Sequence, residues 1–208
     1  MFRNRLDAAI KLGKKLQQFK NKNTVVMAIP RGGLPLGEII ARELEAPLDV
    51  VLSKKIGHPS NKEYAIGAVS LENVLISDST SVSEKYIEEE TARIREKLKS
   101  RQDEYYRTKS PQNLNGKIVI IVDDGIATGN TIMVTAELIR NQNPKKVIVA
   151  VPVAPKSAIK KLNKSSHIDQ VICLLIPPNF RAVGQFYEEF DQVTDKEAIQ
   201  ILRQSVVD

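Results

Sequence analysis

Residues 117–131 of the 208-residue chain read KIVIIVDDGIATGNT, and this stretch decides the fold. The apolar run 118–122 has the length and composition of one buried parallel strand. Asp123 and Asp124 stand where that strand would end, and the small residues that follow cannot continue it. Helical spacing of apolar residues begins at Thr131. The stretch therefore predicts a strand, a tight turn and a helix.

A turn between the carboxyl end of a strand and the start of a helix has a chemical consequence. It presents free backbone N–H groups and the positive end of the helix dipole, which together bind phosphate. Carboxylates beside such a turn can accept hydrogen bonds from sugar hydroxyls or from waters bound to Mg²⁺. The pattern favours a site for a phosphorylated sugar held together with its metal.

The same stretch resembles the 5-phosphoribosyl-1-pyrophosphate (PRPP) signature of type I phosphoribosyltransferases. The resemblance implies that Asp123 and Asp124 hold the ribose hydroxyls and contact Mg²⁺, the expected cofactor, through water. It also implies that the following turn wraps the 5′-phosphate of PRPP. The residues of that turn are Ala127, Thr128, Gly129, Asn130 and Thr131.

A second motif, Pro30-Arg31-Gly32-Gly33, directly follows the first predicted strand. Glycine permits close approach of the backbone to a ligand, and arginine can make forked bonds to phosphate oxygens. In the family this position is the pyrophosphate loop, so Arg31 and Gly32 are expected to bind PRPP, with Arg31 contributing to catalysis. The family also implies an unusual peptide here, and we expect the bond between Arg31 and Gly32 to be cis or otherwise strained. Taken by itself, without the resemblance to the family, the motif is equally typical of a plain turn.

A third candidate element lies in residues 53–65, where two lysines close a short strand and a polar stretch follows. We expect this segment to be a mobile loop. In the family a basic residue at this strand end touches pyrophosphate, which implies a PRPP-binding role for Lys54 and Lys55 and a catalytic one for Lys54. Glu63 resembles the glutamate of a Glu-Tyr pair in adenine phosphoribosyltransferases and is a catalytic candidate. A surface role for the lysines remains the alternative.

The acceptor is less well indicated. Enzymes for 6-oxopurines carry an acidic residue in the signature turn, and the corresponding residue here is Ala127. A hypoxanthine-guanine specificity is therefore disfavoured. The family hood that covers the base is built from terminal segments, so we expect it in residues 176–208, with Phe180 and Val183 as base-binding candidates. A packed C-terminal turn is the alternative.

Strand-like and helix-like segments alternate along the chain, which predicts an α/β fold with a parallel sheet and helices on both faces. The resemblance implies the type I phosphoribosyltransferase fold in a single domain over residues 1–208, with a small hood from terminal segments. Ligands of such sheets bind beyond the carboxyl ends of the strands. Strands are expected at 24–29, 49–52, 66–70, 73–77, 117–122, 146–151 and 170–175, and helices at 4–19, 34–45, 82–107, 130–141 and 155–163.

The helix at 82–107 is long and highly charged. Its narrow apolar stripe fits packing across the sheet edge, a dimer contact or a part of the acceptor pocket. In the first helix, Leu6 and Ile10 are expected to belong to the stripe that faces the core. The N-terminal segment lacks the apolar core of a signal peptide. The single cysteine, Cys173, fits a reducing cytoplasm, where we expect the protein.

Composition limits the partners. A formal net charge of +6 suits a polyanionic small substrate, and the lysines are spread along the chain and do not form one dense block. The leading interpretation is an enzyme that transfers the 5-phosphoribosyl group from Mg²⁺-PRPP to an unidentified nitrogen acceptor and releases pyrophosphate. It would act as a homodimer, without a membrane or nucleic acid. The alternatives are a regulatory protein of the same fold that senses PRPP or nucleotides and binds nucleic acid, and a hydrolase or a transferase for a non-base amine.

Overall fold

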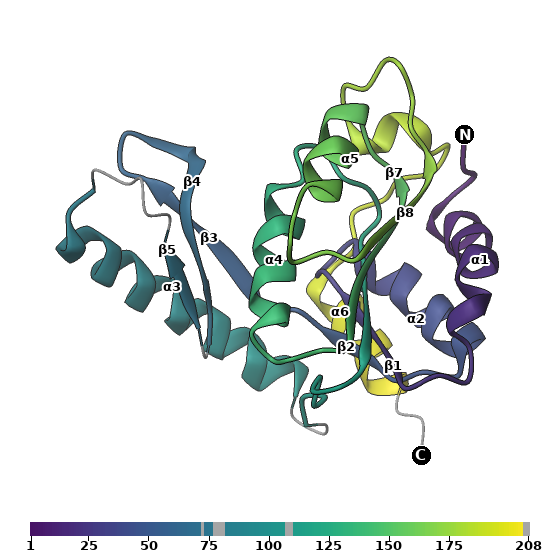
Figure 1. The fold of residues 1–208 in the computed structure, drawn as a ribbon, viewed down its shortest axis with the longest axis horizontal. Coiled ribbons are helices and arrows are strands. Elements are labelled where there is room, and N and C mark those ends of the chain that lie inside the picture. The colour runs from purple at the N-terminus through teal and green to yellow at the C-terminus, as the bar shows by residue number, and fades with distance from the viewer. Residues whose placement is uncertain (72, 77–81, 107–109, 206–208) are drawn as a thin grey trace.

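The computed structural model describes the chain apart from residues 72, 77–81, 107–109 and 206–208, and it describes only the backbone of residues 63 and 65. Its centre is a five-stranded parallel sheet in the order β2-β1-β6-β7-β8 (Figure 1). This confirms the predicted α/β class. The strands are β1 (Thr24–Ala28), β2 (Leu48–Val50), β6 (Ile118–Val122), β7 (Lys146–Val153) and β8 (Gln170–Leu175).

Helices cover both faces of the sheet because its inner strands are apolar on both sides. Val26 and Ile120 belong to the core under α1, α2 and α6, whereas Val25 and Val119 belong to the core under α4 and α5. Every residue of β1 and β6 is buried. The helices are α1 (Arg5–Leu16), α2 (Gly33–Leu44), α3 (Glu84–Tyr105), α4 (Asn130–Arg140), α5 (Lys156–Asn163) and α6 (Asp195–Gln204).

The first helix departs from its predicted face at two positions. Leu6 and Ile10 were expected in the core, but their side chains are 52% and 38% exposed. Leu12 and Leu16 are fully buried as expected. The helix therefore turns a narrower stripe toward the sheet, which leaves Leu6 beside a surface cavity described below.

Residues 53–65 are not a loop, so this expectation was wrong. They belong to an antiparallel arm made of β3 (Ser53–His58), β4 (Asn61–Ser70) and β5 (Val74–Ile76). Figure 1 shows this arm and α3 extending away from the parallel sheet. A small core that includes Ile56 and Ile66 from the strands and Ile94 and Leu98 from α3 holds them together. Residues 53–65 contribute only Ile56 to this core, which explains why the sequence there resembles a polar loop.

The N-terminal segment meets the segment that follows β8, beside the carboxyl edge of the sheet. Phe2 pairs with Tyr187 in a parallel bridge, and the Phe2 amide donates to the Phe186 carbonyl at 2.8 Å. The segment after β8 contains a 3₁₀ turn, Val183–Phe186, and ends in α6. This arrangement agrees with the expected hood from terminal segments. The sequence analysis did not predict α6.

Helix α6 begins with a capping box. The Thr194 hydroxyl accepts a hydrogen bond from the Glu197 amide at 3.2 Å, and the Glu197 carboxylate accepts one from the Thr194 amide at 2.7 Å. Replacing Thr194 with Ala is expected to lower the free energy of unfolding by about 0.5–2 kcal/mol, since one amide loses its acceptor. Thermal or urea unfolding measures the loss. Gln200→Ala, an exposed change on the same helix, is the control, and equal stability of the two variants would contradict the capping role.

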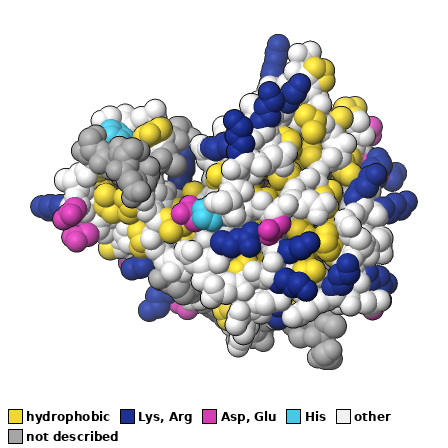
Figure 2. Space-filling model, in the orientation of Figure 1, with side chains coloured by type: hydrophobic (Ala, Val, Ile, Leu, Met, Phe, Trp, Pro, Cys, Tyr) yellow, Lys and Arg dark blue, Asp and Glu magenta, His cyan; other side chains and the backbone are white. Residues whose placement is uncertain are grey.

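None of the described helices combines the length and the hydropathy needed to cross a bilayer. Figure 2 shows Lys and Arg side chains scattered over the visible face and interspersed with apolar and acidic ones. On that face the basic residues agree with the spread that the sequence indicates.

Candidate functional site

The acid pair lies at the carboxyl end of β6. Asp123 and Asp124 are the first two residues after this central strand, next to the end of β1. Burial and the neighbouring charge of Asp124 raise the pKa of Asp123 well above its ordinary value. Burial also raises the pKa of Asp124, although Arg5 acts in the opposite direction. Two adjacent carboxylates with little access to water are arranged for a ligand that supplies hydrogen-bond donors or positive charge.

Arg5 is the partner of the second acid. Its Nη2 and Nε atoms donate to Oδ2 of Asp124 at 2.8 and 3.0 Å. Its Nη1 atom donates to the Asp191 carbonyl at 2.6 Å, and the guanidinium lies 4.0 Å from the centre of the Phe190 ring. The first helix and the C-terminal hood are thereby joined through a single arginine at the acid pair. Nothing in the local sequence around Arg5 indicates this contact.

Tyr187 adds a second connection between the hood and the acids. Its hydroxyl donates to the Asp124 carbonyl at 2.6 Å. Burial and the negative charge of Asp124 raise the pKa of this phenol, so it stays protonated and remains a donor. The backbone at Asp124 is therefore held from the hood side.

The loop 29–33 lies directly against the acid pair. A Cβ atom on Gly32 would stand 2.2 Å from Oδ2 of Asp124, and one on Gly33 would stand 2.5 Å from the Val122 carbonyl. Only glycine fits this contact between the ends of β1 and β6. Arg31 lies beside it, with Nη1 3.6 Å from the Asp195 carboxylate. The structure thus brings together two motifs that are far apart in the sequence.

One detail of this loop was predicted wrongly. The cis peptide joins Pro30 and Arg31, and not Arg31 and Gly32. Gly32 already has helical dihedral angles, φ −60° and ψ −31°, as the N-cap of α2.

The turn 127–131 leads into α4, and Gly129 at its centre is buried. Gly129, the N-cap, has φ 78°, a conformation that favours glycine. Ala127, Thr128 and Thr131 are exposed. Among the described residues, the amides of Ala127 and Thr128 donate to no protein acceptor. Free amides at a helix N-terminus are the components of an anion site.

A lysine stands next to this turn that the sequence did not indicate. Lys161 of α5 donates a hydrogen bond to the side chain of Asn130, the first residue of α4. Its ammonium group adds positive charge beside the free amides. Lys161 follows the signature only after a further strand and most of α5, so only the packing of α5 beside α4 reveals it.

A cavity of about 570 Å³ opens over the acid pair and the loop 29–33. Its lining comes from three parts of the chain: the strand ends, α3, and the terminal segments. These residues are Arg5, Pro30, Arg31, Gly32, Arg101, Asp123, Asp124, Val183, Phe190, Asp191, Gln192 and Val193. Of the candidates predicted from the sequence, Arg31, Gly32, both aspartates and Val183 meet in this cavity.

The remaining candidates lie elsewhere. Phe180 lines a different cavity and its ring stacks on Phe186, with 5.4 Å between ring centres. Lys54 and Lys55 lie in β3, and neither lines the cavity over the acid pair. Glu63 belongs to β4, and its side chain lies outside the described part of the structure.

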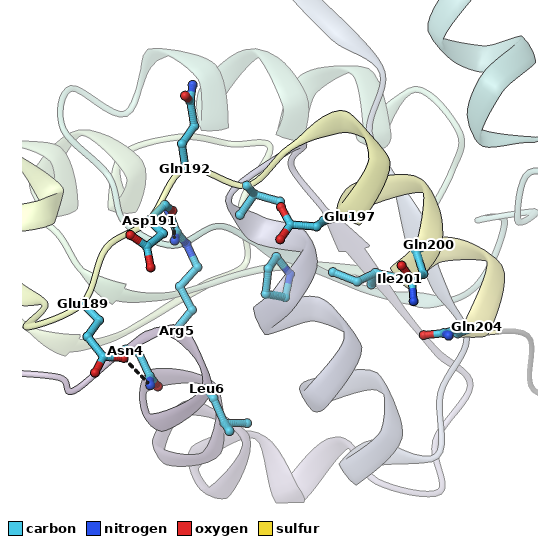
Figure 3. Close-up of a pocket in the computed structure, with 12 residues that line it drawn as sticks. Asn4, Arg5, Leu6, Glu189, Asp191, Gln192, Glu197, Gln200, Ile201 and Gln204 are labelled. Atoms are coloured by element: carbon cyan, nitrogen blue, oxygen red, sulfur yellow. Dashed lines mark hydrogen bonds between the residues drawn. The ribbon is translucent and has the colours of Figure 1, made fainter.

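A second cavity of about 490 Å³ adjoins the first and shares Arg5, Asp191, Gln192 and Val193 with it. Figure 3 shows α6 on one side of this cavity, at the right, and Asn4 hydrogen-bonded to Glu189 on the opposite side, at the left. Acidic and amide side chains dominate its lining, and neither the acid pair nor the turn 127–131 contributes to it. The acid pair and the loop 29–33 therefore belong to the first cavity, whereas the predicted phosphate-binding residues 127–131 line neither of the two cavities.

The donor set fits Mg²⁺ that is bound largely through its ligand. Among the described residues, no group of three or more His, Cys, Asp or Glu side chains could enclose a metal ion. Mg²⁺ keeps several waters and uses one or two carboxylates together with substrate phosphates. Asp123 and Asp124 supply carboxylates of this kind in a cavity that also offers phosphate-binding groups.

Comparison with known proteins extends this description of the site. A family profile described as "Phosphoribosyl transferase domain" matches residues 3–191. The chain is 34% identical over 207 residues to proteins of two Mycobacterium tuberculosis strains, whose names assign them provisionally to the phosphoribosyl transferases. The match covers 97% of this chain but 46% of those relatives, so the chain spans about half their length. A uracil phosphoribosyltransferase of Sulfolobus acidocaldarius is 25% identical, with 78% of this chain and 84% of that protein covered.

Solved structures agree on the fold. The protein TT1426 of Thermus thermophilus superposes with a TM-score of 0.91 at 34% identity, over 99% of both chains. A purine phosphoribosyltransferase of Pyrococcus horikoshii superposes with a TM-score of 0.50 at 18% identity, over 90% of both chains, which shows the shared fold alone. The chain belongs to the phosphoribosyl transferase domain family, and it has the type I phosphoribosyltransferase fold.

Proposed function

We propose that the protein is a pentosyltransferase that transfers the 5-phosphoribosyl group from Mg²⁺-PRPP to a nitrogen acceptor. The observation that carries this proposal is the contact of Gly32 with Asp124, which places the loop 29–33 and the acid pair in one cavity of about 570 Å³. A ligand there can reach a phosphate-binding loop and two carboxylates at the same time. PRPP carries both a pyrophosphate and a pair of ribose hydroxyls.

Each group of the ligand has a partner in this proposal. Asp123 and Asp124 accept hydrogen bonds from the ribose hydroxyls, and the turn 127–131 with Lys161 binds the 5′-phosphate. Arg31 and the backbone of Gly32 bind the pyrophosphate. Mg²⁺, when bound through the acid pair and the ligand, would supply positive charge to the pyrophosphate oxygens.

The reaction breaks the bond between C1′ of the ribose and the pyrophosphate oxygen, and the electron pair leaves with pyrophosphate. The acceptor nitrogen donates its lone pair to C1′ and loses a proton. Arg31 stabilises the charge that develops on the leaving group, and fixed positions of both reactants lower the barrier. Lys54, Lys55 and Glu63 stay candidates for a segment that approaches the bound ligand, and Phe180 stays a candidate for the base.

Binding of PRPP is expected to require Mg²⁺. Without the metal ion, the negative charges of the acid pair and of PRPP would repel each other. Titration calorimetry with PRPP in the presence of MgCl₂, and again with EDTA, measures this. We expect binding in the first case and a large loss of affinity in the second. Equal affinity under both conditions, or no binding at millimolar PRPP, would contradict the site.

A further inference from the structure

Arg5 of α1 and Asp124 form a salt bridge that is largely shielded from water. Each side chain is 13% exposed. Two nitrogens of the guanidinium donate to the same carboxylate oxygen, Oδ2, at 2.8 and 3.0 Å. Breaking such a pair leaves a buried charge without its partner, which is costly. Arg5 therefore fixes the orientation of the Asp124 side chain.

The protein engages each carboxylate of the acid pair through one oxygen. In Asp123, Oδ1 accepts a hydrogen bond from the Asp124 amide at 2.9 Å. In Asp124, the oxygen bound by Arg5 is also the one nearer to Gly32, since a Cβ atom there would stand 2.2 Å from Oδ2 and 3.2 Å from Oδ1. Among the described residues, no group donates a hydrogen bond to Oδ2 of Asp123 or to Oδ1 of Asp124. Each acid thus keeps one oxygen for a ligand.

The guanidinium of Arg5 is in turn fixed by the C-terminal hood. Its Nη1 atom donates to the Asp191 carbonyl at 2.6 Å, and Figure 3 shows Arg5 reaching from α1 toward Asp191. The Phe190 ring, whose centre lies 4.0 Å from the guanidinium carbon, packs on Tyr187 with 4.9 Å between ring centres. The Tyr187 hydroxyl donates to the Asp124 carbonyl at 2.6 Å. The hood therefore contacts Asp124 twice, directly at the backbone and through Arg5 at the side chain.

The position of Arg5 also balances the charge of the acid pair. Two adjacent carboxylates with little access to water repel each other, and free rotation would turn them apart. A cation bound to Oδ2 of Asp124 offsets part of this repulsion and removes the freedom to rotate. Arg5 does so without occupying either of the two oxygens that are left for a ligand.

We infer that Arg5 is a positioning residue for the acid pair. It fixes Asp124 so that Oδ1 accepts a hydrogen bond from a ribose hydroxyl, and its contacts with Phe190 and Asp191 make this orientation depend on the hood. The inference rests on the proposed function, because it assigns the remaining carboxylate oxygens to the ribose of PRPP. Arg5 acts on the ligand through Asp124.

The test measures the affinity of the purified full-length chain for Mg²⁺-PRPP and, in EDTA, for ribose 5-phosphate by titration calorimetry. Arg5→Gln is expected to weaken both about tenfold or more, the order of one lost charged hydrogen bond. Arg5→Lys keeps the charge and should restore part of the loss. Inorganic phosphate has no ribose hydroxyls, so its affinity should not change. Lys15→Gln, which removes the same charge from an exposed position of α1, is the matched control.

A second pair of variants separates positioning from direct contact with the ligand. Asp124→Ala removes the carboxylate that Arg5 positions, so adding Arg5→Gln to it should cause no further loss of PRPP affinity. Non-additive effects of this kind are expected for two residues that act on one contact. A further loss as large as that in the wild-type background would show that Arg5 touches the ligand itself, and it would overturn the inference.

Equal affinity of Arg5→Gln and Lys15→Gln for PRPP, with good binding by the wild type, would also overturn the inference and leave the proposed function standing. Tighter binding by Arg5→Gln would overturn it too, because Arg5 would then compete with the ligand for Asp124. A wild type that binds neither PRPP nor ribose 5-phosphate contradicts the proposed function itself. If circular dichroism shows Arg5→Gln to be unfolded, Arg5→Lys replaces it: this variant should weaken PRPP alone and cause no further loss beside Asp124→Ala.

Discussion

The double replacement Asp123→Asn and Asp124→Asn is expected to abolish useful binding of PRPP while the protein remains folded. Each carboxylate would lose charged hydrogen bonds to the ribose worth about 1.5–3 kcal/mol. Together the loss amounts to about 10²–10⁴ in affinity if the two effects add. Titration calorimetry with Mg²⁺-PRPP measures it. Glu88→Gln, the same chemical change at an exposed position on α3, is the control.

The fold should survive because the acid pair costs the native state stability near neutral pH. The pKa of Asp123 is raised well above its ordinary value of 3.8 in the folded chain. A carboxyl whose pKa is higher when folded makes the free energy of unfolding fall as pH rises from about 3.8 through the raised value. Asn cannot ionise, so Asp123→Asn should remove this loss. The melting temperature of the variant at pH 7 should equal or exceed that of the wild type.

Asp124→Asn is expected to be less favourable for stability than Asp123→Asn, because Asp124 is paired with Arg5. The guanidinium would lose its charged partner, although an Asn oxygen can still accept its hydrogen bonds and the Asp191 carbonyl remains in place. An unfolded double variant, judged by circular dichroism, would show that the pair is structural. The assignment to the ribose would then be withdrawn.

The second large effect concerns the acceptor. Hypoxanthine and guanine should be turned over at least about a hundredfold more slowly than the true acceptor, since a positioned general base contributes about 10²–10⁴ to such reactions. The resemblance to the family implies that Ala127 stands where 6-oxopurine enzymes have a carboxylate. The residue at position 127 does not decide whether adenine is an acceptor. Initial rates with hypoxanthine, guanine, adenine, uracil and orotate at saturating Mg²⁺-PRPP provide the comparison.

Efficient turnover of hypoxanthine would refute the argument from Ala127. Another residue, such as Glu63 on β4, would then have to accept the proton. A second variant tests the same point from the other side, because Ala127→Asp places a carboxylate at an exposed position of the turn. If the argument holds, this variant should gain activity with hypoxanthine relative to the wild type.

The sequence predicts the parallel sheet and the acid pair well because both depend on short local patterns. Residues 118–122 are apolar throughout, and all five are buried in the centre of the sheet. The glycines at 32 and 33 predict a close approach of the backbone to a ligand, which stays a prediction; in the structure they lie against Asp124 and the end of β6, a contact between distant segments that their local sequence does not indicate. The sheet strand and the acid pair are thus encoded within a few neighbouring residues.

The features that were missed depend on contacts between distant segments. Arg5 and Asp124 are 119 residues apart, and Arg101 reaches the cavity only because the arm positions α3. Within the arm, residues 53–65 were taken for a loop because they contribute only Ile56 to its small core. By contrast, α6 could have been predicted, since Thr194 and Glu197 have the spacing of a capping box and apolar residues follow at helical intervals.

The measurement that tests the central claim most directly is a product assay with the wild-type chain. The protein is incubated with Mg²⁺-PRPP and, separately, each member of a panel of nucleobases and amines, and both pyrophosphate and the new compound are quantified by mass spectrometry. We predict that one acceptor yields equal amounts of pyrophosphate and of its 5-phosphoribosyl adduct, and that the Asp123→Asn, Asp124→Asn variant yields neither. Tight binding of PRPP with no adduct from any acceptor, or pyrophosphate release with ribose 5-phosphate as the sole other product, would contradict the transferase.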